Sequence, residues 1–120
     1  MKAQNGLTHA ATIAAENGRS DLAVSYWQKA VTVNPGNAGY RQELATLFAR
    51  KGDWAAARAQ AEQTSRQDPS RAQALAIEAI ACVRSGDTNG GDKLFRKVEL
   101  LAPANLSDLR RWYTTERSRP

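Results

Sequence analysis

The chain has 120 residues, 42% of them hydrophobic, which suffices for one modest domain. It contains no run of about 18 apolar residues, so the sequence predicts no membrane-spanning helix. The 17 basic and 12 acidic residues give a net charge of +5, which favours acidic partners but does not indicate a fold.

The first residues, 1–6, lack the apolar stretch of a secretory signal. We therefore expect a cytoplasmic protein if this is the native N-terminus; the periplasm is the alternative for a mature fragment behind an added methionine. Cys82 is the only cysteine and stands among apolar residues. We expect it to be a small buried side chain rather than a nucleophile.

Two kinds of helix-interrupting residue recur with one spacing. Glycines stand at positions 18, 52 and 86, and prolines stand at 35, 69 and 103. In both series, successive members are 34 residues apart. A period of this length indicates a repeat architecture. One domain of residues 1–120 then holds three units, at about 4–37, 38–71 and 72–105, and a short tail at 106–120.

The first unit reads as two helices, at about 7–17 and 21–33. Residues one helical turn apart form an apolar face on the first of them: Leu7, Ala10, Ala11 and Ala14. Gly18 ends this helix, because glycine adopts the left-handed conformation without steric cost. Ser20 or Asp21 is expected to cap the second helix.

The second unit repeats this pair at about 38–51 and 53–66, with Gly52 between them and Asp53 as the expected cap. The inward-facing residues of its first helix are Leu44, Ala45, Leu47 and Phe48.

The third unit is expected to form helices at about 71–85 and 91–101. The second of these is the weakest pattern, because Gly90 and Gly91 lie near its start and glycine disfavours helix by about 1 kcal/mol against alanine. A seventh helix then follows at about 106–117, starting at Asn105 or Ser107.

With this period, these turns and these caps, the chain resembles the tetratricopeptide repeat family, as three repeats over residues 4–105 and a C-terminal capping helix at 106–117. The family's positions read Leu7, Ala10, Ala11, Ala14, Gly18, Ala23, Trp27, Ala30 and Pro35 in the first unit. They read Arg41, Leu44, Ala45, Phe48, Gly52, Ala57, Ala61, Thr64 and Pro69 in the second, and Leu75, Glu78, Ala79, Cys82, Gly86, Gly91, Phe95, Val98 and Pro103 in the third. The resemblance implies an all-α fold, a right-handed α-solenoid of antiparallel helix pairs with about seven helices.

Three positions depart from the family's pattern. Arg41 and Glu78 occupy places that are usually apolar, and Gly91 replaces the usual alanine. Because two of the three lie in the third unit, we expect that unit to be packed more loosely. Trp27 and Trp54 are interpreted as packing residues.

The resemblance implies that the first helix of each pair lines a concave groove that binds partners. Carried over by position, the groove residues are Asn5, Thr8, His9, Thr12 and Glu16 in unit one, Gln42, Glu43, Thr46 and Arg50 in unit two, and Gln73, Ile77, Ile80 and Arg84 in unit three.

One subclass of the family grips the C-terminal carboxylates of chaperones with lysines, asparagines and an arginine in this groove. The positions that would do so hold Thr8, Thr12, Glu43, Gln73 and Ile77 here. A glutamate would repel a carboxylate, so we do not expect this binding mode.

Two further surfaces allow alternative interpretations. Ile77, Ile80 and Val83 lie off the core face of their helix, either as a core extension covered by the last helix or by self-association, or as an apolar strip that docks a partner helix or extended peptide. Trp112 and Tyr113 either cap the open end of the solenoid or form an interface with another subunit or domain.

Catalytic and nucleic-acid patterns are missing from the sequence. His9 is the only histidine and has no second ligand at metal spacing, and the serines lack a nucleophile-elbow context, so we expect no enzyme, no metal site and no cofactor. The arginines of the last helix (Arg110, Arg111, Arg117 and Arg119) read as a solvated face. Since no nucleic-acid module is apparent, nucleic acid is not an expected partner.

The sequence therefore indicates a non-catalytic scaffold or adaptor that binds a peptide or helix of another protein in its groove. Family analogy suggests a bacterial pilus, secretion or polysaccharide-export assembly. One alternative is a self-association module that forms a homo-oligomer. The other is a basic nucleic-acid or membrane-surface binder.

Overall fold

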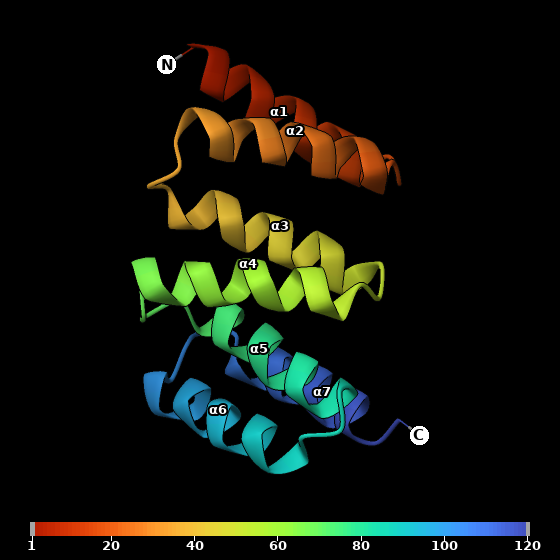
Figure 1. Cartoon of the computed structure of the whole chain (residues 1–120), viewed down its shortest axis with the longest axis vertical. Coiled ribbons are helices and arrows are strands. Elements are labelled where there is room, and N and C mark those ends of the chain that lie inside the picture. Colours follow the sequence, from red (N-terminus) through yellow and green to blue (C-terminus); the bar gives the residue numbers. More distant parts are fainter. Residues whose placement is uncertain (1, 120) are drawn as a thin grey trace.

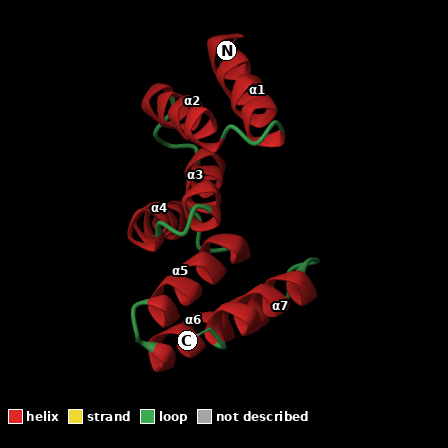
Figure 2. Cartoon of the chain, turned by 90° about the vertical axis from the view of Figure 1, so that its right-hand side faces the viewer, coloured by secondary structure: helices red, strands yellow, loops and turns green. Residues whose placement is uncertain are grey.

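Seven helices follow one another through residues 2–119, the part of the chain that this computed structural model describes; side chains are described for residues 6–119. The helices are α1 (Lys2–Glu16), α2 (Ser20–Val33), α3 (Ala38–Arg50), α4 (Trp54–Gln67), α5 (Ala72–Arg84), α6 (Thr88–Leu101) and α7 (Leu106–Arg117). Consecutive helices run antiparallel and stack along one axis, which makes the molecule elongated, 42 × 27 × 23 Å (Figures 1 and 2). The all-α solenoid expected from the sequence is confirmed.

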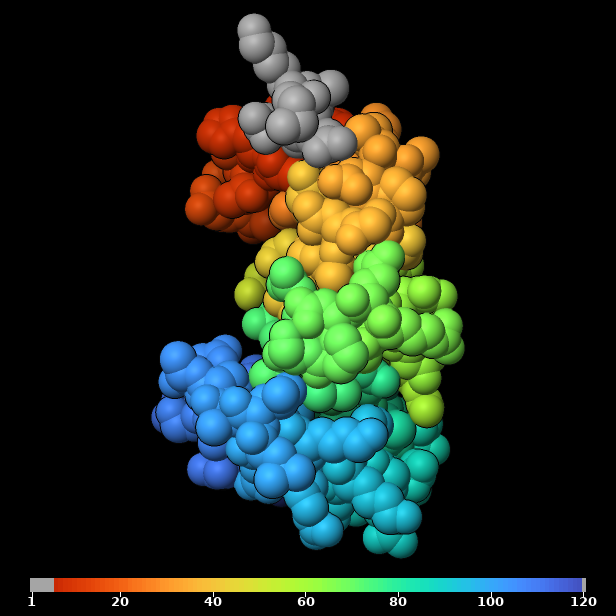
Figure 3. Space-filling model, turned by 90° about the vertical axis from the view of Figure 1, so that its left-hand side faces the viewer, coloured from red at the N-terminus to blue at the C-terminus, as the bar shows by residue number. Residues whose placement is uncertain are grey.

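The turn inside each unit has one geometry, used three times. Gly52 has a φ of +80°, and the amide of Asp53 donates to the carbonyl of Phe48, five residues back, at 2.9 Å. The turns at Gly18 and Gly86 contain the same bond at 2.8 Å. A left-handed glycine closed by this bond is the Schellman ending of a helix, which turns the chain back sharply. Each pair therefore packs as an antiparallel unit, and the units stack in sequence along the long axis (Figure 3).

Aspartates start the second helices of the last two pairs. The Asp53 carboxylate accepts a hydrogen bond from the amide of Ala56 at 3.2 Å, as expected, and Asp87 accepts one from Gly90 at 2.8 Å. The Asp87 cap lets α6 begin at Thr88, three residues earlier than the two glycines suggest.

The first unit does not use this cap. The N-cap position of α2 is Arg19, which makes no side-chain bond, so the expectation of a cap from Ser20 or Asp21 is wrong. Both residues lie inside the helix, and the Asp21 carboxylate instead pairs with Lys51 of the next unit.

Small residues form much of the core. Ala11, Ala23, Ala30, Ala45 and Ala57 have no exposed surface. Side chains without bulk let helices approach closely, and larger side chains fill the wider gaps. Trp27 fills one such gap beside Tyr40, with ring centroids 5.6 Å apart, and Cys82 is buried as expected. Phe48 is half-buried, between two core clusters, rather than fully inward.

The third unit is not packed loosely, contrary to expectation. A Cβ atom on Gly91 would lie 2.6 Å from Val83 Cγ2, 2.8 Å from the carbonyl oxygen of Ala79 and 2.9 Å from the Tyr113 hydroxyl. The missing side chain therefore brings α6 close to α5 and α7. Glu78 is buried as well, and accepts a hydrogen bond from Ser65 Oγ at 2.6 Å.

Helix α7 is held against α6 by a ring stack and an ion pair. The rings of Tyr113 and Phe95 stack with centroids 4.5 Å apart. The Tyr113 hydroxyl donates to Asp92 at 2.6 Å, and Arg117 donates to both Asp92 oxygens at 2.9 Å. Burial, and then the Asp92 carboxylate, raise the pKa of Tyr113.

Among the described residues, no helix is long and apolar enough to cross a membrane.

The close packing around Gly91 predicts that an alanine substitution there destabilises the fold, although alanine favours helix more than glycine does. Gly91→Ala gains up to about 1 kcal/mol of helix propensity but adds overpacking of about 1–3 kcal/mol, so a net destabilisation is expected in denaturant unfolding. Gly6→Ala is the matched control, because Gly6 lies in α1 with nothing within 4 Å of its added Cβ, and it should stabilise. Equal stabilisation by both changes would contradict the packing.

The bonds of Tyr113 and Arg117 to Asp92 predict that the stability of the fold depends on pH. Arg117 and then Tyr113 lower the pKa of Asp92 to about 2. A carboxyl group with a depressed pKa stabilises the fold above its unfolded pKa, and this contribution is lost as the pH falls through the folded value. The unfolding temperature should therefore fall between about pH 4 and about pH 2 less steeply in Asp92→Asn than in the native chain. Asp108→Asn, which removes an exposed carboxylate from α7, should keep the native slope.

Candidate functional site

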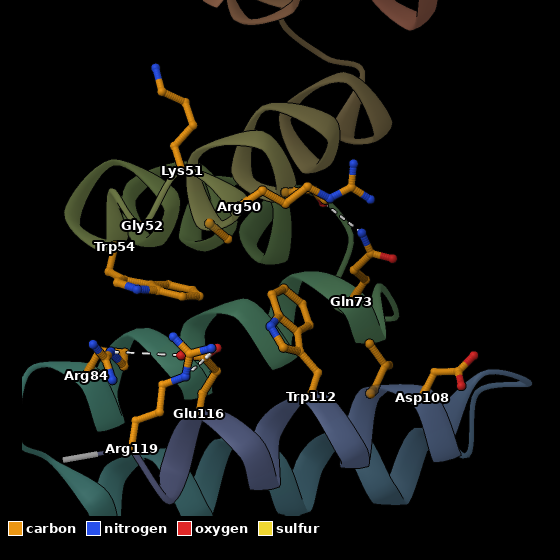
Figure 4. A pocket seen from close by; sticks show the side chains of 13 residues that line it. Arg50, Lys51, Gly52, Trp54, Gln73, Arg84, Asp108, Trp112, Glu116 and Arg119 are labelled. Atoms are coloured by element: carbon orange, nitrogen blue, oxygen red, sulfur yellow. Dashed lines mark hydrogen bonds and ion pairs between the residues drawn. The ribbon is translucent and has the colours of Figure 1, made fainter. Parts of the chain in front are cut away.

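A cavity of about 640 Å³ opens between α3, α5 and α7, on the side formed by the first helices of the pairs (Figure 4). The turn between α3 and α4 closes one end of it, because Lys51, Gly52 and Trp54 belong to its lining. We call this cavity the groove.

Four of the residues predicted to line the groove do so together. Thr46 and Arg50 come from α3, and Gln73 and Arg84 come from α5. Gln73 Nε2 donates to Thr46 Oγ1 at 2.7 Å, and that hydroxyl donates to the carbonyl of Gln42 at 2.9 Å. The first of these bonds joins two neighbouring first helices, so the groove is already formed in the free chain.

The other polar positions lie elsewhere. Thr8, His9 and Thr12 line a separate depression on α1. Gln42 is half-buried and Glu43 is exposed on α3, and neither belongs to the groove lining. Partial desolvation nevertheless raises the pKa of Glu43, an effect that Arg50 and then Arg71 oppose. Glu16 is exposed, and the side chain of Asn5 lies outside the described residues.

The two isoleucines are not surface residues. Ile77 and Ile80 have no exposed area, so they do not form a docking strip. Ile77 packs with Ala45, Ala49 and Trp112, while Ile80 packs in the cluster that contains residues of α6 and α7. A core extension covered by α7 is therefore the arrangement found in the structure.

Trp112 and Tyr113 do not form an exposed surface at the end of the solenoid. Tyr113 is buried, and Trp112 is half-buried and points into the groove toward Trp54, with ring centroids 6.4 Å apart and planes tilted by 44° (Figure 4). We did not predict the pairing of Trp54 with Trp112 from the sequence. Trp112 stands one repeat period after Glu78, which places it in the core register, but α7 packs mainly across α5 rather than α6 and turns the ring into the groove.

The groove carries more positive than negative charge. Its lining includes four cationic residues (Arg50, Lys51, Arg84 and Arg119) and two carboxylates (Asp108 and Glu116). Glu116 is only 8% exposed and lies 4.0 Å from Arg84 Nε and 3.6 Å from Arg119 Nε. One carboxylate therefore faces two guanidinium groups, and Arg50 makes no ion pair within the described residues.

The site offers binding groups rather than reactive ones. Within residues 6–119, no cluster of three or more His, Cys, Asp or Glu could hold a metal ion. His9 is exposed on α1, away from the groove, and burial raises the pKa of the Cys82 thiol. A paired aromatic floor with guanidinium groups at its edge is suited to hold an apolar side chain next to an anionic one.

Comparison with known proteins gives one family and several structural relatives. The family model described as tetratricopeptide repeat matches residues 9–72 and 43–89. This match confirms the resemblance inferred from the sequence. Among curated protein sequences, none matches the chain.

Three solved structures illustrate the likeness. The Arabidopsis OM64 TPR domain is 16% identical, with a TM-score of 0.82 over 95% of this chain and 96% of that chain. The first TPR of Spaghetti, bound to an HSP90 peptide, is 17% identical, with a TM-score of 0.80 over 94% of both chains. The Yersinia enterocolitica type III secretion translocator chaperone SycD is 12% identical, with a TM-score of 0.84 over 98% of this chain and 90% of that chain. At these identities the likeness shows the fold.

The position of Trp112 predicts a structural cost when it is removed. Trp112→Ala uncovers Ile77 and the alanines beside it, so a loss of about 2 kcal/mol is expected in denaturant unfolding, less than for a fully buried tryptophan. Arg111→Ala, next to it on α7 with a side chain 79% exposed, should leave stability nearly unchanged. Equal stability of the two variants would show that Trp112 does not pack against α5.

Proposed function

Because the chain belongs to the tetratricopeptide repeat family, we propose that it is a non-catalytic interaction module that binds a segment of a partner protein in the groove. The observation that carries this proposal is the groove itself, a cavity of about 640 Å³ between three helices that opens to solvent with its polar bonds already made. A preformed site reduces the ordering cost of binding.

The side chains that line the groove favour a partner segment with both an apolar and an acidic residue. The tilted pair of Trp54 and Trp112 presents apolar ring surface, which suits an aromatic or aliphatic side chain. Arg50 is exposed beside it without an ion pair among the described residues, and suits a carboxylate of the same segment. We therefore propose a short segment in which an apolar residue stands near an aspartate or glutamate.

This proposal does not extend to the capture of a C-terminal carboxylate in the manner of the chaperone-binding subclass. Gln73 is engaged with Thr46, and Ile77 is buried, so two of the five positions that would make such contacts do not present a free polar group. The HSP90 peptide bound by the Spaghetti domain supports only the general use of this fold for peptide binding.

We also propose that the module belongs to a larger assembly, with a bacterial pilus, secretion or polysaccharide-export machine as the setting that family analogy favours. Self-association is the alternative function. The SycD structure, described as an alternative dimer, supports it as a use of this fold.

Charge reversal at Arg50 tests the groove. Arg50→Glu should reduce capture of the native partner by about tenfold or more, because a carboxylate would then face the partner's own carboxylate. The measurement is pull-down of partner from the native organism by the purified chain, quantified by mass spectrometry and repeated with the identified partner at known concentrations.

Arg66→Glu is the matched control, since Arg66 is exposed on α4 and lies outside the groove lining. It should retain the partner, and circular dichroism should show both variants folded. Loss of binding in both variants, or in neither, would contradict the groove as the binding site. A molar mass that rises with concentration in light scattering and falls in the Arg50 variant would favour self-association.

A further inference from the structure

A second pocket, of about 410 Å³, lies between α4, α5 and α6. It shares no lining residue with the groove, and uses a different face of α5. We call it the α4–α6 pocket. The C-terminal parts of α4, in green, and α6, in blue, lie together on the face that Figure 3 presents.

The walls of the α4–α6 pocket are mostly leucine. Leu75 forms its buried floor, and Leu94 is half-buried beside it. Leu100 is 80% exposed and Leu101 is 40% exposed, and both stand at its edge. Large apolar side chains exposed next to a pocket are a common mark of an interaction surface.

A carboxylate stands in these apolar walls. Glu78 is only 9% exposed, and its one hydrogen bond within the described residues is accepted from Ser65. Desolvation raises the pKa of Glu78, because the ionised form loses hydration without gaining a cation in contact. A cation brought by a ligand would compensate for the lost hydration.

The repeat provides an internal reference for this site. One repeat before Ser65 and Glu78, the equivalent positions hold Val31 and Leu44, an apolar pair in which Leu44 is fully buried. The same joint between units can therefore be built without a charge. The equivalents of Leu100 in the two preceding repeats are Arg66 and Thr32, both polar. The buried charge and the exposed leucine are thus both departures from the repeat, and they meet in one pocket.

The charges around Glu78 leave it open to a cation. Arg58 is already paired with Glu62, at 3.4 Å. Lys97 lines the pocket and is exposed, and it makes no ion pair with Glu78 among the described residues. Helix α6 ends at this pocket, at Leu101, and the free carbonyls of a helix C-terminus also favour positive charge.

We propose that the α4–α6 pocket is a second docking site, which receives a leucine-rich segment of a partner protein whose lysine or arginine pairs with Glu78. The apolar side chain of the segment fills the space between Leu75, Leu94 and Leu101, and the cation lies against the carboxylate. The chain can then hold two segments at once, an acidic one in the groove and a basic one here. The two sites are independent, so failure of either leaves the other standing.

The test uses three end-blocked peptides, Leu-Arg-Leu-Leu, Leu-Gln-Leu-Leu and Leu-Glu-Leu-Leu, titrated at millimolar concentration into the isotope-labelled full chain. The arginine peptide should shift the amide resonances of residues lining the α4–α6 pocket, and should bind about fivefold more tightly than the glutamine peptide. The glutamate peptide should bind most weakly.

Glu78→Gln keeps the shape and the acceptor for Ser65, and should abolish the preference for arginine. Glu99→Gln removes a carboxylate of α6 that lies outside the pocket lining and pairs with Arg110 of α7, and it should preserve the preference. Equal binding of the arginine and glutamine peptides, shifts confined to the groove, or a preference that survives in Glu78→Gln would each overturn the proposal.

A double variant, Ser65→Val with Glu78→Leu, supplies a second readout. It recreates the apolar pair of the preceding unit, so it should raise the unfolding temperature, and it should also remove the arginine preference. A lower unfolding temperature would show that Glu78 serves the fold, and would also count against the docking site.

Discussion

The hydrogen bond that reaches back five residues across each left-handed glycine is the constraint on which the structure depends. It appears at Gly18, Gly52 and Gly86 and fixes the return of the second helix onto the first. Because that return is the same in every unit, alanines of successive helices meet at short range and form a continuous core. The position of the groove follows from the same turn, since the turn at Gly52 forms part of the groove wall.

The third unit shows how departures from a repeat acquire separate roles. Gly91 looks like a weak point in a helix, but its missing side chain admits the carbonyl of Ala79 and the hydroxyl of Tyr113. Glu78 costs desolvation at a joint that the preceding unit builds from apolar residues. The first departure improves packing, whereas the second buries a charge at a joint that the preceding unit builds without one, which is why we assign it to binding.

The sequence predicts the helices, the turns and the family, because glycine, proline and alanine act locally and recur with one period. It predicts Thr46, Arg50, Gln73 and Arg84 as groove residues for the same reason, since each follows from the register of a first helix. It does not predict Trp112 in the groove, and it leaves open whether Ile77 lies in the core or on a docking surface. Both depend on how α7 lies across α5, and that is decided by the Tyr113–Phe95 stack and the Asp92–Arg117 pair, which join residues far apart in the chain.

The central claim is that the partner binds in the groove between α3, α5 and α7. Its most direct test places a photo-crosslinking amino acid at Asp108, an exposed residue of α7 that lines the groove, and in a second variant at Thr115, an exposed residue of the same helix outside the groove lining. Irradiation in the native organism should join one partner protein to position 108 and leave position 115 free. Crosslinks to that partner from position 115 alone would contradict the account.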